Sequence, residues 1–221
     1  MHTTDETPEQ LGRRERKKAE TRRAIMEIAL SLALEHGLEG LTVAQISEAV
    51  DIAPRTFFNY FSCKEEALVG DGAVTAAELR TRIADRPRDE APLDTLRAVM
   101  IATTLKMSET DREQVRLRQQ VIQDHVALRS RQLAQFATVE RALAEGVAER
   151  LDVDPDGDPR PEVLAALALG VMRVSIRRWA TDASRPLDDL VAAGFDLIRQ
   201  ETRTSTTTDP RSSKEASSRG E

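Results

Sequence analysis

Residues 42–68 read TVAQISEAVDIAPRTFFNYFSCKEEAL, and this stretch decides the fold. Within it, residues 43–50 carry apolar side chains three and four positions apart, which predicts a short helix with one buried face. Thr42 precedes this helix as an N-cap, because its hydroxyl can accept a hydrogen bond from a backbone N–H of the first turn. Pro54 suits the first turn of a second short helix, where its missing N–H costs little. Two short helices joined by a tight turn indicate a helix-turn-helix, a motif whose second helix enters the major groove of DNA.

This segment resembles the DNA-binding domain of TetR-family transcriptional repressors, whose signature runs roughly T-V-x-x-I-A-x-x-A-G-V-S-x-G-T-L-Y-x-H-F-x-S-K-E-E-L. The part that begins RTFFNYF is similar to a common actinobacterial branch, which includes regulators of the mycofactocin system. The resemblance is strong over residues 21–68 and only architectural beyond them. The matching positions are Thr42, Val43, Ile46, Ile52, Thr56, Phe61, Lys64, Glu65 and Leu68.

Several positions depart from that signature. Asp51 stands where the family usually has a turn glycine, although aspartate tolerates a left-handed backbone better than most residues do. Ala53 replaces the usual capping serine, which weakens the start of the second helix by ~1 kcal/mol. Phe58 replaces a tyrosine and Tyr60 replaces a histidine, so a hydroxyl group is present two residues away from its usual place.

The resemblance implies which residues contact DNA. Ala44, Arg55 and Asn59 would face base edges, and Arg55 is the best candidate for a bidentate contact to guanine. The alternative for Arg55 is a solvated side chain at a helix start. Phosphate groups would be held by Thr42, Thr56, Tyr60 and Lys64, while Phe57 and Phe61 would pack in the core.

The distribution of charge also favours a nucleic-acid partner. The chain has 221 residues and a formal net charge of −6 at pH 7, which taken alone argues against one. Residues 13–23, however, are strongly basic, and they lie directly ahead of the motif. We expect this segment to contact phosphates through Arg13, Arg14, Arg16 and Lys17, the alternative being a solvated, disordered tail.

The composition and the periodicity predict an all-α protein. Hydrophobic residues make up 40% of the chain and charged residues 32%, which is typical of a soluble globular protein, and alanine and leucine favour helices. One helix is expected to run continuously over residues 64–85 and to join two domains, with a kink near Gly70 and Gly72. The expected divisions are a disordered basic arm (1–16), the helix-turn-helix DNA-binding domain (17–63), a helical effector-binding and dimerisation domain (64–203) and a disordered tail (204–221).

The C-terminal domain is expected to hold an effector pocket and a dimer interface. Adaptable methionines and one tryptophan fit an apolar or amphipathic ligand, although core packing is an equal alternative. The resemblance to mycofactocin-system regulators suggests an acyl-CoA-like ligand. The pocket is predicted at Met100, Thr104, Met107, Met172 and Trp179. The last helix has an apolar stripe to bury, internally or in a homodimer, at Leu187, Leu190, Val191, Gly194, Phe195 and Ile198.

No catalytic residue, metal site or cofactor is expected. An enzyme would need a nucleophile with a base or paired carboxylates in a pocket, and of the three histidines only His125 could line one. Residues 152–158 begin like a calcium loop, but Val163 stands where the ligating glutamate belongs. The single Cys63 fits a reducing cytoplasm, and no apolar run is long enough to span a membrane.

Taken together, the resemblance implies a homodimeric transcriptional repressor that reads a pseudo-palindromic operator in double-stranded DNA. A small apolar or amphipathic ligand would release it, and it would be cytoplasmic, and nucleoid-associated when bound to DNA. The alternative is a helical interaction adaptor or a ligand-binding protein without catalytic activity. That alternative leaves the basic segment and residues 42–68 unexplained.

Overall fold

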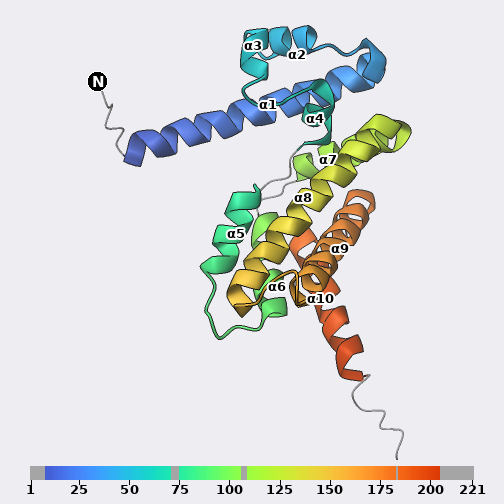
Figure 1. Cartoon of the computed structure of the whole chain (residues 1–221). Coiled ribbons are helices and arrows are strands. Elements are labelled where there is room, and N and C mark those ends of the chain that lie inside the picture. Colours follow the sequence, from blue (N-terminus) through green and yellow to red (C-terminus); the bar gives the residue numbers. More distant parts are fainter. Residues whose placement is uncertain (1–7, 71–74, 106–108, 183, 205–221) are drawn as a thin grey trace, which may run out of the picture. The chain divides into compact units, whose positions relative to one another are not determined.

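The computed structural model describes residues 8–70, 75–105, 109–182 and 184–204, and within them all regular structure is helical (Figure 1), which confirms the all-α prediction. The helices are Pro8–Gly40 (α1), Val43–Ala49 (α2), Pro54–Phe57 (α3), Lys64–Val69 (α4), Ala76–Ala84 (α5), Pro92–Thr104 (α6), Glu109–Asp124 (α7), Val126–Leu151 (α8), Arg160–Thr181 (α9) and Leu187–Thr204 (α10).

The chain divides into two compact units. The first comprises Met1–Glu78 and Ser108–Val139, and the second comprises Leu79–Met107 and Glu140–Glu221. The first unit therefore extends beyond the expected DNA-binding domain of residues 17–63. The reason is that α4 and α7 pack against α1 and against each other. Helix α8 belongs to both units, because the division falls within it.

Helix α1 is the long element of the first unit. It begins at Pro8, so residues 8–16 of the expected disordered arm are helical, in keeping with their arginine, glutamate and glutamine residues. Residues 1–7 lie outside the described residues. The helical backbone is interrupted at Gly37, where φ is 73°. Glycine adopts this left-handed region readily, which is why helices often end at such a residue.

The expected continuous helix over residues 64–85 is wrong. Helix α4 ends at Val69 because Gly70 has φ 72° and ψ 165°, a conformation that no α-helix contains. Helix α5 starts separately at Ala76, where a Thr75–Glu78 capping box begins it. The predicted connection between two domains through one rigid helix is therefore absent.

A single hydrophobic core holds the first unit together. Apolar side chains from α1, α2, α3, α4, α7 and the start of α8 are buried in it. The largest of them are Ile25, Leu41, Ile46, Phe57, Phe61, Leu68, Ile122 and Leu128. Because α1 contributes to this core from Ile25 to Leu38, the position of this part of α1 is coupled to that of the helix-turn-helix.

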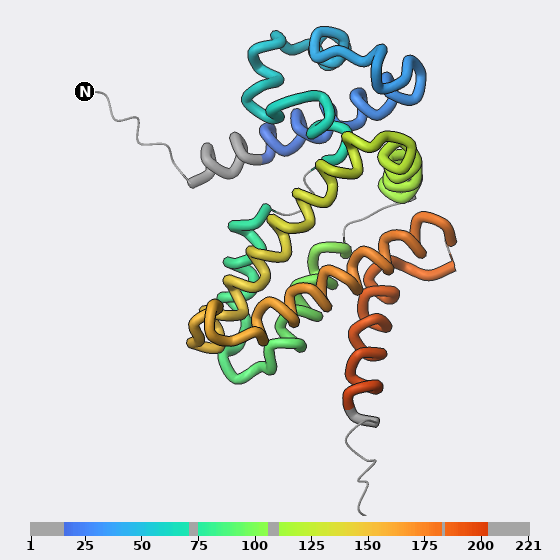
Figure 2. Tube along the Cα trace, turned by 45° about the vertical axis from the view of Figure 1, so that its right-hand side comes forward, coloured from blue at the N-terminus to red at the C-terminus, as the bar shows by residue number. Residues whose placement is uncertain are grey.

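The second unit is built around α6, α9 and α10, which pack against one another (Figure 2). Leu96 and Val99 of α6 are buried with Leu169 of α9. Gly194 of α10 allows close approach to α9: a Cβ atom there would lie 2.6 Å from Cγ1 of Val171. The small residue is therefore required by the packing of α9 and α10.

Candidate DNA-binding interface

The first helix of the motif is capped at its N-terminus as expected. The hydroxyl of Thr42 accepts a hydrogen bond from the backbone N–H of Gln45 (3.2 Å), and the Gln45 side chain accepts one from the backbone N–H of Thr42 (2.9 Å). These two bonds form a capping box, which satisfies two donors of the first turn. The N-cap prediction for Thr42 is confirmed, whereas its phosphate contact stays a prediction.

The turn between α2 and α3 depends on Asp51. Its φ is 57°, in the left-handed region, and the backbone N–H of Ile52 donates to the carbonyl of Ser47 at 2.9 Å. This geometry matches the expectation that aspartate stands in for a turn glycine. Pro54 occupies the first turn of α3, and Ala53 ahead of it makes no side-chain capping bond. The start of α3 is thus fixed by proline stereochemistry and not by a cap.

Along α3 and the residues directly after it, two aromatic side chains are buried and two polar side chains are exposed. Phe57 and Phe61 are fully buried, with ring centroids 5.8 Å apart, so the core role predicted for them is confirmed. Arg55 on α3 and Asn59 just after it, two of the predicted base-reading residues, are exposed. Ala44 on α2 is exposed as well. These three side chains are accessible to a nucleic acid.

Two candidate phosphate ligands, Thr56 and Tyr60, are half-buried. The backbone of Tyr60 has a further role, because its carbonyl accepts a hydrogen bond from the guanidinium of Arg22. The same guanidinium stacks on the ring of Phe61, with Cζ 4.0 Å from the ring centroid. Arg22 therefore ties α1 to the end of α3, a contact that the sequence does not signal because the partners lie 38 and 39 residues away.

Lys64 has an intramolecular role. Its half-buried ammonium donates to the carbonyl oxygens of Leu38 and Leu41, both at 2.8 Å. These bonds join the start of α4 to the end of α1 and to the residue that follows it. Two of the three N–H donors of the ammonium are thus engaged within the chain, so we expect Lys64 to serve the fold more than a phosphate; the phosphate contact itself stays a prediction.

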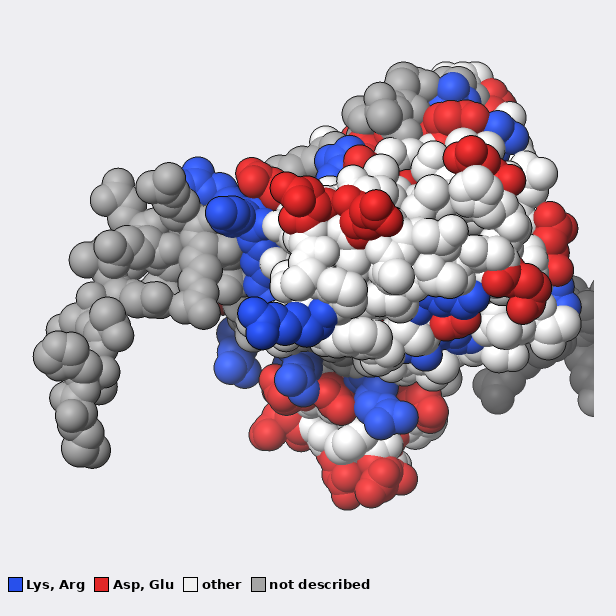
Figure 3. All heavy atoms as spheres, turned by 90° about the horizontal axis from the view of Figure 1, so that it is seen from above, with Lys and Arg blue, Asp and Glu red and all other residues white. Residues whose placement is uncertain are grey.

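The basic segment is divided between surface and internal roles. Arg16 and Lys17 are exposed on α1, and Figure 3 shows lysine and arginine side chains gathered where the described part of this helix begins. Arg13 and Arg14 lie in α1, but their side chains are outside the described ones. Arg23 pairs with Glu27 and Asp111 at 2.7 and 2.9 Å, and the hydrogen bond to Glu27, followed by the charge of Asp111, raises the pKa of the arginine.

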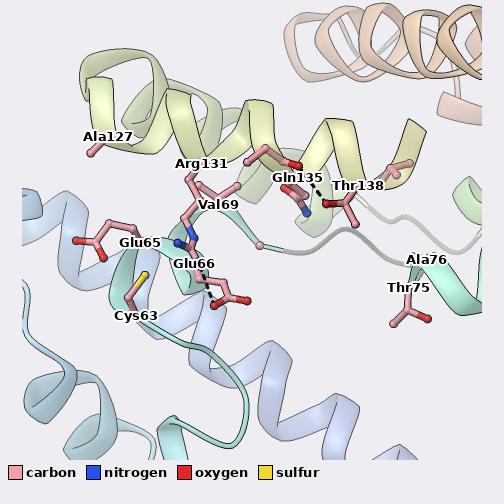
Figure 4. A pocket seen from close by; sticks show the side chains of 13 residues that line it. Cys63, Glu65, Glu66, Val69, Thr75, Ala76, Ala127, Arg131, Gln135 and Thr138 are labelled. Atoms are coloured by element: carbon pink, nitrogen blue, oxygen red, sulfur yellow. Dashed lines mark hydrogen bonds and ion pairs between the residues drawn. The ribbon is translucent and has the colours of Figure 1, made fainter. Parts of the chain in front are cut away.

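A clasp of three side chains joins α8 to the beginning of α4. Nη2 of Arg131 donates to Oγ of Ser62 (2.8 Å) and to Oε2 of Glu66 (3.0 Å), which also accepts from the backbone N–H and hydroxyl of Ser62 (both 2.6 Å). Figure 4 shows Arg131 pointing toward Glu66. Although burial works to raise the pKa of Glu66, the bonds from Ser62 and the charge of Arg131 hold it below its ordinary value. Sequence reasoning missed this clasp, whose arginine is 65 residues from the glutamate.

Beside this clasp lies a cleft of about 740 Å³ in the first unit. It is lined by both charged and apolar side chains, among them Cys63, Glu66, Val69, Arg131 and Gln135 (Figure 4). His125, the one histidine expected to be able to line a pocket, instead has Nδ1 2.8 Å from the carbonyl oxygen of Val121. His125 therefore contacts the backbone at the end of α7, where α7 joins α8.

The predicted effector residues lie on two helices that pack together. Met100 and Thr104 of α6 and Trp179 of α9 are buried, and Met172 of α9 is half-buried. Met107 lies outside the described residues. Burial of this kind fits both core packing and the wall of a ligand site, so the pocket stays a prediction.

Three of the six residues predicted for the dimer interface cannot contact a second copy. Leu187, Val191 and Phe195 are buried within the chain itself, because α10 packs this face on α6 and α9. They have no surface left for a second copy. Leu190, Gly194 and Ile198 are half-buried. The apolar side chains of α9 and α10 that are exposed are Val163 (54%), Leu167 (39%), Val174 (42%) and Leu197 (56%).

Two other kinds of site are absent from the described part of the chain. No helix there is both long and apolar enough to cross a membrane. The same residues contain no cluster of three or more histidine, cysteine, aspartate or glutamate side chains able to hold a metal ion. The acidic loop between α8 and α9 is occupied by local bonds, such as the pair between Asp158 and Arg160.

Comparison with known proteins covers both units. Residues 25–69 match the family model of bacterial regulatory proteins, tetR family, and residues 90–203 match the MftR C-terminal domain. The chain is 34% identical over 208 residues to the HTH-type transcriptional regulator TcmR of Streptomyces glaucescens, with 90% of this chain and 92% of TcmR covered. It is 29% identical over 184 residues to MftR of Mycobacterium tuberculosis, a candidate regulator of mycofactocin biosynthesis, with 83% and 91% covered.

A solved structure has a similar fold. FadR from Bacillus subtilis, in complex with stearoyl-CoA, aligns with a TM-score of 0.51 and 17% identity over 80% of this chain and 96% of FadR.

Proposed function

Because this chain belongs to the TetR family of bacterial transcriptional regulators, we propose that it is a homodimeric repressor of a pseudo-palindromic DNA operator. The observation that carries the proposal is the division along α3 and the residues directly after it, with Phe57 and Phe61 buried and Arg55 and Asn59 exposed. Such a helix has a polar face for base edges and an apolar face that fixes its position. One short helix reads few base pairs, so two copies related by two-fold symmetry are needed for a specific site.

Within this proposal, base reading and phosphate binding belong to different residues. Arg55 is assigned to a bidentate contact with guanine O6 and N7, supported by Asn59 and Ala44. Arg16, Lys17, Thr42, Thr56 and Tyr60 are assigned to phosphates, together with Arg13 and Arg14.

Dimerisation is assigned to the exposed apolar face of α9 and α10. Val163, Leu167 and Val174 follow one another at helical spacing on α9, and Leu197 adds to them from α10. An exposed apolar stripe of this kind favours association with a second copy. Val174→Asp should shift the protein to a monomer in sedimentation or light-scattering measurements. Leu105→Asp, at an exposed leucine outside this face, is the matched control.

Release by a ligand is assigned to the second unit. Met100 and Trp179 supply buried apolar surface on adjoining helices, which suits an apolar or amphipathic ligand. Acyl-CoA compounds are the first class to screen, because the FadR of similar fold holds stearoyl-CoA. Trp179 is the chain's one tryptophan and provides the optical signal.

The clasp between Arg131, Ser62 and Glu66 supports a route from ligand to DNA. Helix α8 contributes residues to both units, and the clasp bonds it to the residues that begin α4. A ligand that shifts α8 would therefore disturb the segment that follows α3. A coupling free energy of ~1–3 kcal/mol would change operator affinity by roughly 5–150-fold.

The proposal is tested by DNA binding to the promoter next to the protein's own gene. Arg55→Ala should weaken binding to the operator by about 5–150-fold per half-site and leave binding to random DNA nearly unchanged, since base contacts matter only on the correct sequence. Arg88→Ala, at an exposed arginine between α5 and α6, is the matched control. Equal losses on operator and random DNA would remove Arg55 from the reading of bases.

A further inference from the structure

Phe58 is an aromatic side chain with no place in the core. It follows α3 directly, and 57% of its surface is exposed. It lies three residues after Arg55 and one before Asn59, so all three share the exposed side of the motif while Phe57 faces inward. Exposing a large apolar ring to water is unfavourable, so its position beside the base-reading residues indicates that it is covered when the motif binds its partner.

The ring is also held in place. Its centroid is 5.5 Å from that of Phe57, and the two planes meet at 84°, an edge-to-face arrangement. Phe57 is fully buried, so the Phe58 ring rests on a side chain that is packed in the core. A side chain already positioned by such a contact loses little conformational entropy when it binds.

The chemistry of the ring restricts what it can recognise. A phenyl group has no hydrogen-bond donor or acceptor, so it cannot hold a phosphate oxygen or the polar edge of a base. In the major groove the exposed apolar group is the C5 methyl of thymine. Intercalation between base steps belongs to minor-groove proteins and does not fit a helix that enters the major groove.

We propose that Phe58 is a specificity-determining residue that packs on a thymine methyl group in each half-site, next to the base contacted by Arg55. This rests on the proposed function, in which α3 enters the major groove. Its consequence is that the operator contains a thymine whose methyl group, and not its hydrogen-bonding edge, is recognised. Ala44, which is also exposed, is the competing candidate for such a methyl contact.

The test replaces each operator thymine by deoxyuridine, which removes the methyl group and leaves base pairing intact. At one symmetric pair of positions, the full-length protein should lose about 4-fold in affinity per half-site, or roughly 16-fold for both. Phe58→Ala should bind the unmodified operator more weakly and should not distinguish thymine from deoxyuridine there. Phe58→Leu, which keeps an apolar group, should retain part of the discrimination.

The possible results distinguish a failure of the Phe58 role from a failure of the proposed DNA-binding function. If the wild-type protein does not bind the promoter at all, the proposed function fails. If it binds but tolerates every deoxyuridine, DNA binding stands and the role of Phe58 is refuted. If Phe58→Ala keeps the full discrimination while Ala44→Gly loses it, the methyl group is read by Ala44 and the proposal is overturned. Thermal unfolding of each variant checks that exposed Phe58 can be replaced without loss of the fold.

Discussion

Replacing Lys64 by methionine should destabilise the first unit without changing the salt dependence of DNA binding. The ammonium of Lys64 donates to the carbonyl groups of Leu38 and Leu41, both at 2.8 Å, and methionine keeps the length of the chain but none of the charge. Hydrogen bonds to a charged group are worth about 1.5–3 kcal/mol each when buried. Lys64 is only half-buried, so we expect a total loss of about 2 kcal/mol. For a chain of this size, that is a fall in Tm of about 4–8 °C.

The assay combines thermal unfolding with DNA binding at several salt concentrations. Each lysine that neutralises a phosphate adds about 0.9 to the slope of log K against log salt, on any duplex sequence. Lys64→Met should leave this slope unchanged. Lys17→Met is the matched control, because Lys17 is exposed on α1 and assigned to a phosphate. That variant should reduce the slope by about 0.9 for each protomer, or about 1.8 for the proposed dimer, and leave Tm unchanged.

The opposite pattern would refute this reasoning. A Lys64→Met protein with wild-type Tm and a slope reduced by about 0.9 for each protomer would mean that the lysine leaves its carbonyl partners to bind DNA. The two carbonyl bonds would then contribute little to the fold.

Three further predictions concern the packing and the turns. The bonds from Ser62 and Arg131 hold the pKa of Glu66 below its ordinary 4.5 although burial opposes them, so their contribution is full above that pH and is lost as the pH falls through the lowered value. Glu66→Gln should remove this part of the pH dependence in urea unfolding. Asp51→Gly should stabilise the first unit by up to about 1 kcal/mol, because glycine adopts φ 57° freely; Asp51→Val should destabilise it in the same measurement. Gly194→Ala should cost about 1–3 kcal/mol in the unfolding of the second unit, since its Cβ would lie 2.6 Å from a valine methyl group of α9.

The sequence by itself determines the helix-turn-helix, because the signals that build it are local. Thr42 caps α2 through a residue three positions away, Asp51 tolerates the left-handed turn, and Pro54 starts α3. The four-residue spacing of Phe57 and Phe61 places both rings on one face. Each of these features depends on neighbours within one helical turn, and each can be read without knowing the rest of the chain.

The tertiary structure alone decides the partners of the long polar side chains. A lysine or an arginine carries the same charge whether it faces a phosphate, a carbonyl group or a carboxylate. Lys64 meets the end of α1, Arg22 meets the ring of Phe61, and Arg131 reaches Glu66. These partners are 23 to 65 residues away, and no local pattern encodes such contacts.

The same limit applies to the apolar stripes. Helical spacing predicts that Leu187, Val191 and Phe195 are buried, but it cannot say whether the chain itself or a second copy covers them. Packing on α6 and α9 answers that question, since it leaves these side chains inside and Leu197 outside. Periodicity reports that a face is apolar; only the position of the neighbouring helices determines what that face contacts.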